Sequence, residues 1–501
     1  MKRKRRFNAC ASIPIVEHIP VEISPSEQQR IAKPAGDLLD EEPGLRSIEP
    51  FGENVAIGLG PWPNLVFEDH SGIALFDPAD EVTYAHRALL LAGEDDLVVI
   101  GVPRSAVFEE YCRSGLRLGA PEILAPAGHP PHRSLAVRCL RDTELLERVA
   151  RRARAAGGLN LLPYMGTGGA WALAGAIAER ADVRVWVGAP PPRLTNRAND
   201  KIWFAERVAE VLGEQALPPS DPVFSLSALV RRMRNLSKDH ASIAVKLPAS
   251  AASVGNFVFN SDELSRLPAR EACDLLRHAM REAGWRGSFP LLVTGWEQPV
   301  AASPSVQLWL QGNGAPVVEG VFEQALIGSN AQFAGAAPAD LPARWLKRIA
   351  SEAVRLGWFF RHLGYFGRCS FDAILVGGDP AGWQLHWVEC NGRWGGTSIP
   401  MTLANRLVGD WHRRPFVVVD RRSAVQRSTV EFGRLLEEIG DDLFVPGVRE
   451  AGIVLIRPTG PAAGLAFMAF GDTVTAARAK VQKVLSTERL LAASGRTRLV
   501  A

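Results

Sequence analysis

Arg368-Cys-Ser-Phe-Asp-Ala-Ile-Leu-Val376 is the first half of the stretch that decides the fold. The second half is Trp383-Gln-Leu-His-Trp-Val-Glu-Cys-Asn-Gly-Arg-Trp-Gly-Gly396, and the segment Gly377-Gly-Asp-Pro-Ala-Gly382 separates the two. Glycine, proline and aspartate between two apolar runs favour chain reversal, so we predict an antiparallel β-hairpin. Its register is expected to place Asp372 opposite Glu389, to within about one residue.

The polar side chains of this hairpin gather on one face of each strand. Because side chains alternate along a strand, Arg368 and Asp372 share one face of the first strand. By the same rule Glu389, Asn391 and Arg393 share one face of the second strand. Carboxylate and amide oxygens suit Mg²⁺, and arginines hold phosphate oxygens bidentately. The hairpin therefore predicts a metal–phosphate site, with a surface ion-pair cluster as the alternative.

The hairpin resembles the metal-binding signature of the ATP-grasp superfamily, in which an acidic residue on one strand is followed by Glu-x-Asn on the next. Asp372, Glu389 and Asn391 match that signature, which implies that they bind the metal. The continuation Asn391–Gly396 is similar to the pheganomycin-type peptide ligases, whose grasp follows a pre-ATP-grasp domain. The resemblance covers about residues 196–410 well and residues 50–195 more loosely. It implies ATP and Mg²⁺ as cofactors, with Mn²⁺ as an alternative metal.

Two lysines resemble the ATP-binding lysines of the superfamily and occur in the right order. Lys201 stands at the start of a helix predicted over residues 200–212, where a solvated surface charge is the alternative. Lys246 ends the alternating apolar run Ile243-Ala-Val245 of a predicted strand. An ammonium that points inward from such a strand needs a phosphate or an acidic partner.

The assignments of the hinge and of the phosphate-covering loop rest mainly on the family resemblance, because the residues themselves support them less. Trp296 and Glu297 follow an apolar strand and look like the hinge whose backbone holds adenine. For Glu297 an ordinary strand-end carboxylate is the alternative. The covering loop of many ATP-grasp enzymes is glycine-rich, whereas residues 248–256 contain one glycine. The resemblance then assigns the phosphate contacts to Ser250, Ser253, Gly255 and Asn256.

Short apolar runs alternate with helical patterns along the chain, which predicts an α/β fold, α+β overall, with a parallel sheet in the first half. Residues 1–50 are rich in Pro, Glu and Ser and lack sustained periodicity, so we predict a flexible leader. The resemblance implies a Rossmann-like pre-ATP-grasp domain at 51–195 and an ATP-grasp domain of two α+β subdomains at 196–411. Residues 412–501 are predicted to form a small C-terminal α/β unit.

Residues 163–170 join a predicted strand to a predicted helix and contain part of a dinucleotide-binding fingerprint. Gly166 and Gly168 fit its first two glycines, but Trp171 occupies the third position. The next predicted strand also lacks a terminal acidic residue. We therefore favour a tight strand–helix turn, whose helix N-terminus retains the capacity to hold an anionic group.

Composition excludes several classes of function. A net charge of +3 in 501 residues gives no reason to expect a nucleic-acid or membrane partner. The six cysteines are scattered without a C-x-x-C pair, which disfavours a disulfide framework and a structural zinc, and favours a cytoplasmic location. The basic run Lys2–Arg6 lacks the uninterrupted apolar segment of a signal peptide, so we expect a solvated end.

The function implied by the resemblance is an ATP-dependent ligase that activates a carboxylate as an acyl phosphate and joins it to an amine. Arg393, with Arg368 as a second candidate, is expected to stabilise the developing oxyanion. The substrates are then a small-molecule or peptide carboxylate and an amine, and a homodimer is compatible with the resemblance. The alternatives are a phosphotransferase or carboxylating enzyme on the same nucleotide site, and an ATP-binding regulatory protein without turnover.

Overall fold

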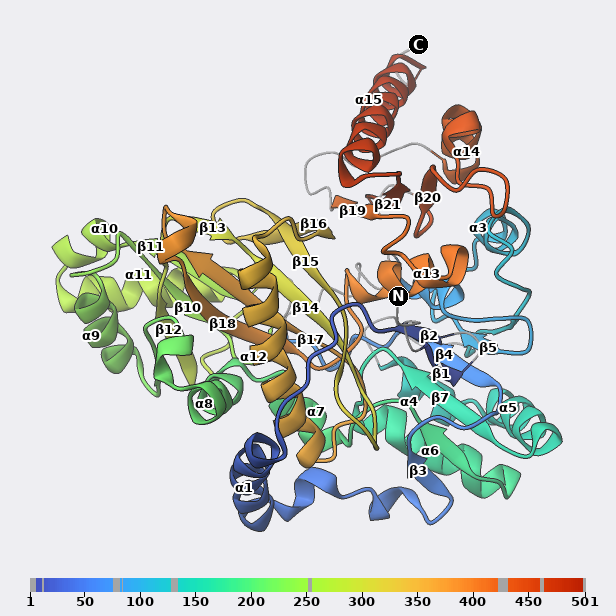
Figure 1. The fold of residues 1–501 in the computed structure, drawn as a ribbon, viewed down its shortest axis with the longest axis horizontal. Helices are drawn as coiled ribbons and strands as arrows, with labels where there is room; N and C mark the ends of the chain where they lie inside the picture. The colour runs from blue at the N-terminus through green and yellow to red at the C-terminus, as the bar shows by residue number, and fades with distance from the viewer. Residues whose placement is uncertain are drawn as a thin grey trace.

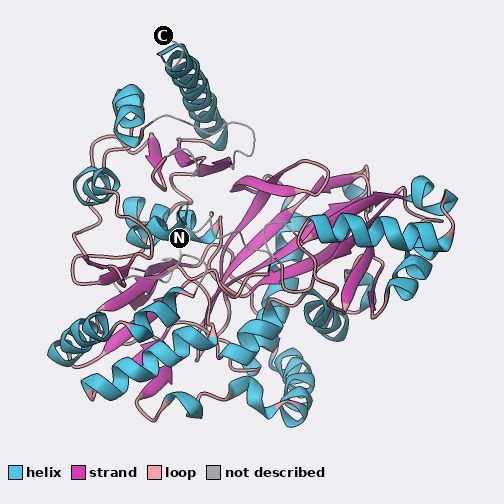
Figure 2. Cartoon of the chain, turned by 180° about the vertical axis from the view of Figure 1, so that it is seen from behind, coloured by secondary structure: helices cyan, strands magenta, loops and turns pink. Residues whose placement is uncertain are grey.

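The structure is a computed structural model that describes residues 6–10, 13–74, 82, 84–127, 134–250, 255–421, 431–459 and 464–498. Within these ranges the chain forms three main sheets and a two-stranded ribbon, with helices packed around them (Figures 1 and 2). The arrangement confirms the predicted α/β class with α+β character. Among the described residues, no helix has the length and apolar character needed to cross a bilayer.

The first sheet is six-stranded and entirely parallel, with the order β3-β8-β7-β4-β5-β6. Helices cover parallel sheets on both faces, which explains why these strands are largely buried. The strands are β3 (Val55–Ile57), β4 (Asn64–Phe67), β5 (Leu97–Val99), β6 (Glu122–Leu124), β7 (Leu159–Pro163) and β8 (Val185–Val187). The helices of this region are α3 (Ala106–Glu110), α4 (Leu135–Arg141), α5 (Thr143–Ala156) and α6 (Gly168–Ala181).

The turn between β7 and α6 is the tight connection that was favoured over a nucleotide fingerprint. The Thr167 side chain accepts a hydrogen bond from the Ala170 N–H and caps the helix. A Cβ atom at Gly166 would lie 2.5 Å from the carbonyl oxygen of Pro190. Close packing of the backbone therefore accounts for this glycine.

The second sheet is four-stranded and antiparallel, with the order β11-β10-β12-β9. Its strands are β9 (Ser220–Val223), β10 (Ser242–Lys246), β11 (Asn256–Asn260) and β12 (Leu291–Gly295). The helices that pack with it are α9 (Leu226–Leu236), α10 (Ser261–Arg266) and α11 (Ala269–Glu282). Helices α7 (Pro192–Ala198) and α8 (Lys201–Leu212) connect the parallel sheet to this one.

The third sheet is nine-stranded and contains the hairpin predicted from the sequence. Its order is β13-β17-β14-β15-β16-β19-β21-β20, and β18 pairs with β17. The strands are β13 (Val300–Ala302), β14 (Pro304–Leu310), β15 (Val317–Ile327), β16 (Gln332–Pro338), β17 (Gly367–Val376), β18 (Gln384–Asn391), β19 (Phe416–Arg421), β20 (Ile453–Leu455) and β21 (Leu465–Phe470). Its helices are α12 (Ala343–His362), α13 (Ser398–Val408), α14 (Phe432–Ile439) and α15 (Val474–Arg498).

The strands of the predicted C-terminal unit continue this third sheet. Strand β19 pairs with β16 through Gly335 opposite Val419 and Ala336 opposite Val418. Figure 1 shows β19, β21 and β20 beyond this junction, with α15 packed beside them. The C-terminal strands are thus joined to β16 by a short stretch of strand pairing.

The prediction of a flexible leader is wrong for residues 25–41, which form helix α1 (Pro25–Glu41). Ile31, Ala35 and Leu38 are buried on one side of α1, which packs against α12. The Ser24 side chain caps the helix by accepting the Glu27 N–H. Three apolar positions among many polar ones, with Pro34 inside the helix, gave too weak a period to be recognised from sequence.

Candidate active site

A cavity of about 730 Å³ lies where residues from all three sheets approach one another. The four-stranded sheet contributes Lys246 and Thr294 to its lining. The hairpin β17–β18 contributes Asp372 and Glu389, and the loop after β4 contributes His70. A concave site that combines several titratable groups is the default location for substrate binding in a chain of this kind.

The hairpin has the predicted register. Asp372 lies opposite Glu389, and Ser370 lies opposite Asn391. Directly opposed residues of an antiparallel pair share a face, so the two carboxylates and the amide converge on the cavity. A register shift after Asp372 leaves Val388 as an extra residue in β18.

The two facing carboxylates have different electrostatic surroundings. Burial and the charge of Glu389 raise the pKa of Asp372 to about 7. Asp372 accepts hydrogen bonds from Ser305 Oγ at 2.5 Å and from Asn391 Nδ2 at 2.9 Å. Burial alone would raise the pKa of Glu389, but the ammonium of Lys201 beside it holds that pKa below its usual range.

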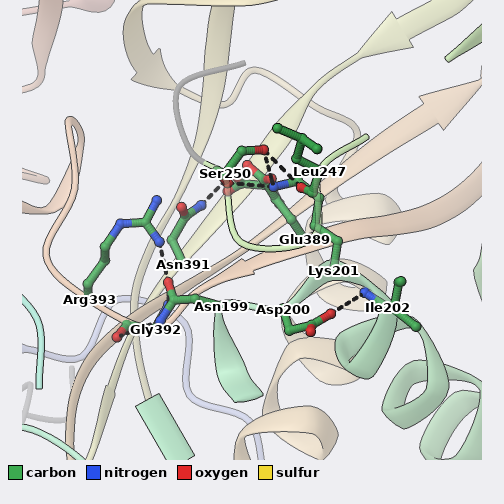
Figure 3. Close-up of polar contacts among 11 residues, drawn as sticks. Asn199, Asp200, Lys201, Ile202, Leu247, Ser250, Glu389, Asn391, Gly392 and Arg393 are labelled. Atoms are coloured by element: carbon green, nitrogen blue, oxygen red, sulfur yellow. Dashed lines mark hydrogen bonds and ion pairs between the residues drawn. The ribbon is translucent and has the colours of Figure 1, made fainter. Parts of the chain in front are cut away.

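Lys201 is buried, which rules out the solvated position that was its alternative. It is the first residue of α8, whose N-terminus is capped by the Asp200 side chain. Its Nζ lies 3.0 Å from Oε2 of Glu389 and donates to the carbonyl oxygen of Ser250 at 2.6 Å (Figure 3). The lysine therefore joins the helix to the carboxylates and to the covering loop.

Lys246 ends β10 and points toward the same cavity. Burial lowers its pKa to about 8, and the positive charge of Lys201 acts in the same direction. Its Nζ lies 5.8 Å from the centre of the Trp296 ring. A buried ammonium has a lowered pKa where the protein alone supplies too little negative charge to stabilise it.

The covering loop is described at its two ends only, and Ser253 lies outside the described residues. Ser250 Oγ donates to the Leu247 carbonyl at 2.9 Å. A Cβ at Gly255 would lie 2.2 Å from Ser250 Oγ, so this turn requires glycine. Asn256 lines the cavity, whereas Gly255 is not part of its lining.

Trp296 and Glu297 follow β12 and line the cavity, as the hinge prediction requires. The Trp296 N–H donates to the Ser242 carbonyl at 2.9 Å, so this donor is occupied by β10. The Glu297 carboxylate lies 2.6 Å from Nδ1 of His386 on β18. This contact gives Glu297 a structural role, which the interpretation as an ordinary strand-end carboxylate did not include.

Arg393 lines the cavity just beyond the metal-type residues. Its Nη1 donates to Oδ1 of Asn199, which also accepts the Gly392 N–H at 3.1 Å (Figure 3). Asn199 Nδ2 donates to the Thr195 carbonyl at 2.7 Å, which fixes the amide. Asn199, which orients Arg393, was not among the predicted site residues, because the two are 194 positions apart in sequence.

Arg368 does not reach the cavity. Its guanidinium is fully enclosed, pairs with Glu319 and donates to Thr402 Oγ1 at 3.2 Å. The rings of Trp309 and Trp394 flank it, with centroids 5.2 Å and 5.0 Å from its Cζ. This position does not support the catalytic role predicted for Arg368, because side chains from β14, β15 and α13 seal its end of the strand face.

The cavity also has a wall that the sequence analysis did not identify. It consists of side chains from the region of the parallel sheet and of Asp420 from β19; the first group is His70, Tyr84, Arg87 and Tyr164. These residues lie hundreds of positions from Asp420 in sequence, and only Tyr164 belongs to a segment singled out from the sequence, residues 163–170. No local signal could have placed them together.

Comparison with known proteins agrees with this architecture. Residues 85–179 match the family model described as the pre ATP-grasp domain. A search of the curated proteins finds no match.

Solved structures provide a comparison for most of the chain. An N5-carboxyaminoimidazole ribonucleotide synthetase in complex with ADP shares 12% identity at a TM-score of 0.51, covering 86% of this chain and 97% of that one. A biotin carboxylase from Campylobacter jejuni, in a complex with β,γ-ATP, shares 13% identity at a TM-score of 0.51, covering 87% and 92%. At such identities the likeness concerns the fold. The chain shares its fold with these structures, and residues 85–179 of its parallel-sheet region are similar to the pre ATP-grasp domain.

Proposed function

We propose that this chain is an ATP-dependent carboxylate–amine ligase that forms an amide or peptide bond through an acyl phosphate, with release of ADP and phosphate. The observation that carries the proposal is the convergence of five fixed charges on one cavity and its wall. They are Asp372, Glu389, Lys201, Lys246 and Arg393. Buried charges of both signs are costly, and a phosphate-bearing substrate with its metal accounts for all of them.

The oxygens of Asp372, Glu389 and Asn391 fit a divalent cation. The set consists of two carboxylates and one amide, which suits Mg²⁺ and also admits Mn²⁺. The raised pKa of Asp372 supports this assignment, because its buried carboxylate faces the half-buried carboxylate of Glu389, and the two need compensating positive charge. The Asn391 amide nitrogen donates to Asp372 in this structure. The amide has to rotate by a half-turn before its oxygen can face the metal.

When bound, Mg·ATP supplies the phosphoryl group and the charge that polarises it. The chain's own part is positioning and neutralisation, which provide most of the catalysis in phosphoryl transfer. Lys246 faces the cavity directly, and Lys201 holds Glu389 in its charged form. Trp296 and Glu297 border the region proposed for adenine, and any backbone contact from the hinge has to come from the Trp296 carbonyl or from residues beyond it.

Arg393 is the residue proposed to face the acyl group as negative charge develops on its oxygen. Its guanidinium is held by Asn199, and Arg393 lines the same cavity as the metal-type residues and the inner wall. A protein that only binds ATP has no need of a cation fixed beyond the phosphate region, which disfavours the regulatory alternative. Within the covering loop Gly255 and Asn256 remain proposed phosphate contacts, as does Ser253.

The proposal is tested by ADP release from Mg·ATP with a panel of amino acids and short peptides, and hydroxylamine as a general amine. We expect hydroxamate formation that depends on one class of organic carboxylate. ADP release that requires bicarbonate would instead identify a carboxylating enzyme. Tight ATP binding without ADP release from any mixture would overturn the ligase proposal in favour of a regulatory protein.

A further inference from the structure

The inner wall of the cavity begins next to Arg393 and runs into the pre-ATP-grasp domain. The Trp394 N–H donates to the Tyr164 carbonyl at 3.0 Å, which ties the residue after Arg393 to this wall. The His70 ring then lies 4.3 Å from the ring of Tyr164 and 5.6 Å from the ring of Tyr84. The wall therefore adjoins the segment that follows Arg393 and lines the same cavity as the metal-type residues.

Arg87 gives this wall a cation with one donor still available. Its Nε and Nη2 donate to the two oxygens of Glu68 at 3.2 and 2.7 Å, and both residues are buried. Among the described residues nothing accepts from its Nη1, although Arg87 lines the cavity. A buried guanidinium held by one carboxylate, with a free edge on a cavity, is suited to a second anionic group.

Asp420 gives the same wall an anion with one acceptor still available. Its Oδ1 accepts from Nη2 of Arg457 at 2.9 Å, and in the described part of the chain its other oxygen has no donor. Arg457 and Arg87 both lie against the Tyr84 ring, with Cζ–centroid distances of 5.1 and 4.2 Å. The available donor of Arg87 and the available oxygen of Asp420 therefore belong to side chains that are connected through Tyr84 and Arg457.

We propose that this inner wall binds the amine-bearing substrate, and that this substrate is an amino acid or peptide with its own carboxylate. Its carboxylate binds Arg87 and its ammonium binds Asp420. The inference rests on the proposed function for the role of this ligand as a substrate. A simple amine would leave Arg87 unused, whereas a zwitterion matches both free groups and the aromatic side chains between them.

The first experiment measures equilibrium binding to the wild-type chain by titration calorimetry. The probes are the proteinogenic amino acids and a set of glycine-containing dipeptides, each compared with its C-terminal amide and its N-acetyl form. We expect at least one free zwitterion to bind, and each blocked form to bind about tenfold more weakly or worse, because each loses one charge-assisted contact. Equal affinity of free and blocked forms, or no binding by any probe, would overturn the inference.

Variants then assign each contact. Arg87→Lys keeps the charge but not the forked geometry, and we expect it to lose the discrimination against C-terminal amides. Asp420→Asn is expected to lose the discrimination against N-acetyl forms. Arg104→Lys is the matched control, since Arg104 makes an exposed ion pair with Glu109 in the same domain. A purely structural role of the two pairs predicts unchanged discrimination in every variant that folds.

The prediction of zwitterion binding and the prediction of ligase turnover can fail independently of each other in these experiments. Zwitterion binding that follows Arg87 and Asp420, without any hydroxamate formation, supports the ligand site and removes the ligase. Hydroxamate formation without discrimination between free and blocked ligands supports the ligase and removes this substrate class.

Discussion

Arg368 and Asp372 lie on the same face of β17, four residues apart, yet their surroundings have little in common. The side chains of Arg368 and Glu319 are 1% and 0% exposed, and two tryptophan rings flank the guanidinium. Asp372 faces Glu389, whose side chain is 27% exposed and which borders the cavity. One end of the strand thus carries a closed pair of opposite charges, and the other carries like charges beside an open space.

The difference shows that alternation along a strand decides which face a side chain occupies, but not what covers that face. The enclosed ion pair of Arg368 and Glu319 is neutralised without any ligand, so it contributes to the structure of the free protein. The facing carboxylates, of which Asp372 has a raised pKa, lack compensating charge until a cation binds. The predictions below test this division of β17 into a sealed end and an open end.

The largest effect is expected at the open end. Asp372→Asn keeps the shape and the contact with Ser305 but removes one charge of the proposed metal set. We expect ADP release in the hydroxylamine assay to fall about 10³–10⁴-fold, because the metal supplies several kcal/mol of charge stabilisation. Asp379→Asn, in the exposed turn of the same hairpin, is the control and should stay near the wild-type rate. Comparable rates in the two variants would contradict an active role for the open end.

At the sealed end the effect should be on stability instead. Arg368→Met leaves Glu319 buried without its partner, which we expect to lower the free energy of unfolding by about 3–5 kcal/mol in urea titrations. Adding Glu319→Leu should restore much of that loss, because the uncompensated charge is removed. Turnover per folded molecule should stay the same in both. A loss of turnover without a loss of stability would return Arg368 to the catalytic group.

Arg393 lies between these extremes, since it is both held by Asn199 and open to the cavity. Arg393→Ala should lower kcat by about 10²–10³-fold, the usual cost of one oxyanion-stabilising group. ATP binding, measured by calorimetry, should remain close to that of the wild type because the phosphate region is unchanged. Parallel losses of ATP binding and of product would place Arg393 in the nucleotide site instead.

The smallest effect concerns pH. Lys246 has a lowered pKa of about 8 in the free protein, and ATP is expected to bind its protonated form. Above that pH the lysine has to take up a proton on binding, so ATP affinity should fall by at most about tenfold per pH unit. Below it the same lysine is already charged, and its contribution should be flat. Lys246→Arg should make the affinity insensitive to pH across 7–10, and an unchanged slope would exclude Lys246 as the titrating group.

Local signals were enough to predict the hairpin and much of the secondary structure. The register of Asp372 against Glu389 followed from alternation and from a turn rich in glycine. The strand and the helix predicted on either side of residues 163–170 are present as β7 and α6. Lys201 and Lys246 were found through a family resemblance, and their burial could not be read from spacing alone.

The remaining features depend on residues that are distant in sequence. Arg368 is sealed by Glu319 from β15 and by Thr402 from α13, and no pattern near residue 368 announces either of them. In the inner wall Arg87 and Arg457 lie against the Tyr84 ring, and Arg457 pairs with Asp420. Arg87 belongs to the region of the parallel sheet, whereas Asp420 lies on β19 of the nine-stranded sheet. Helix α1 escaped prediction for the same reason, since its apolar side is recognisable once α12 is known to cover it.

Helix α1 has a consequence for how the chain is made. Its Glu27 pairs with Arg355 of α12, 328 residues further along. During synthesis α1 leaves the ribosome well before its binding surface exists, and the delay is on the order of tens of seconds at common elongation rates. Throughout that time its apolar stripe is without cover, and the domain made in between folds beside it. The contact between α1 and α12 therefore forms late, because Glu27 is translated 328 residues before its partner Arg355.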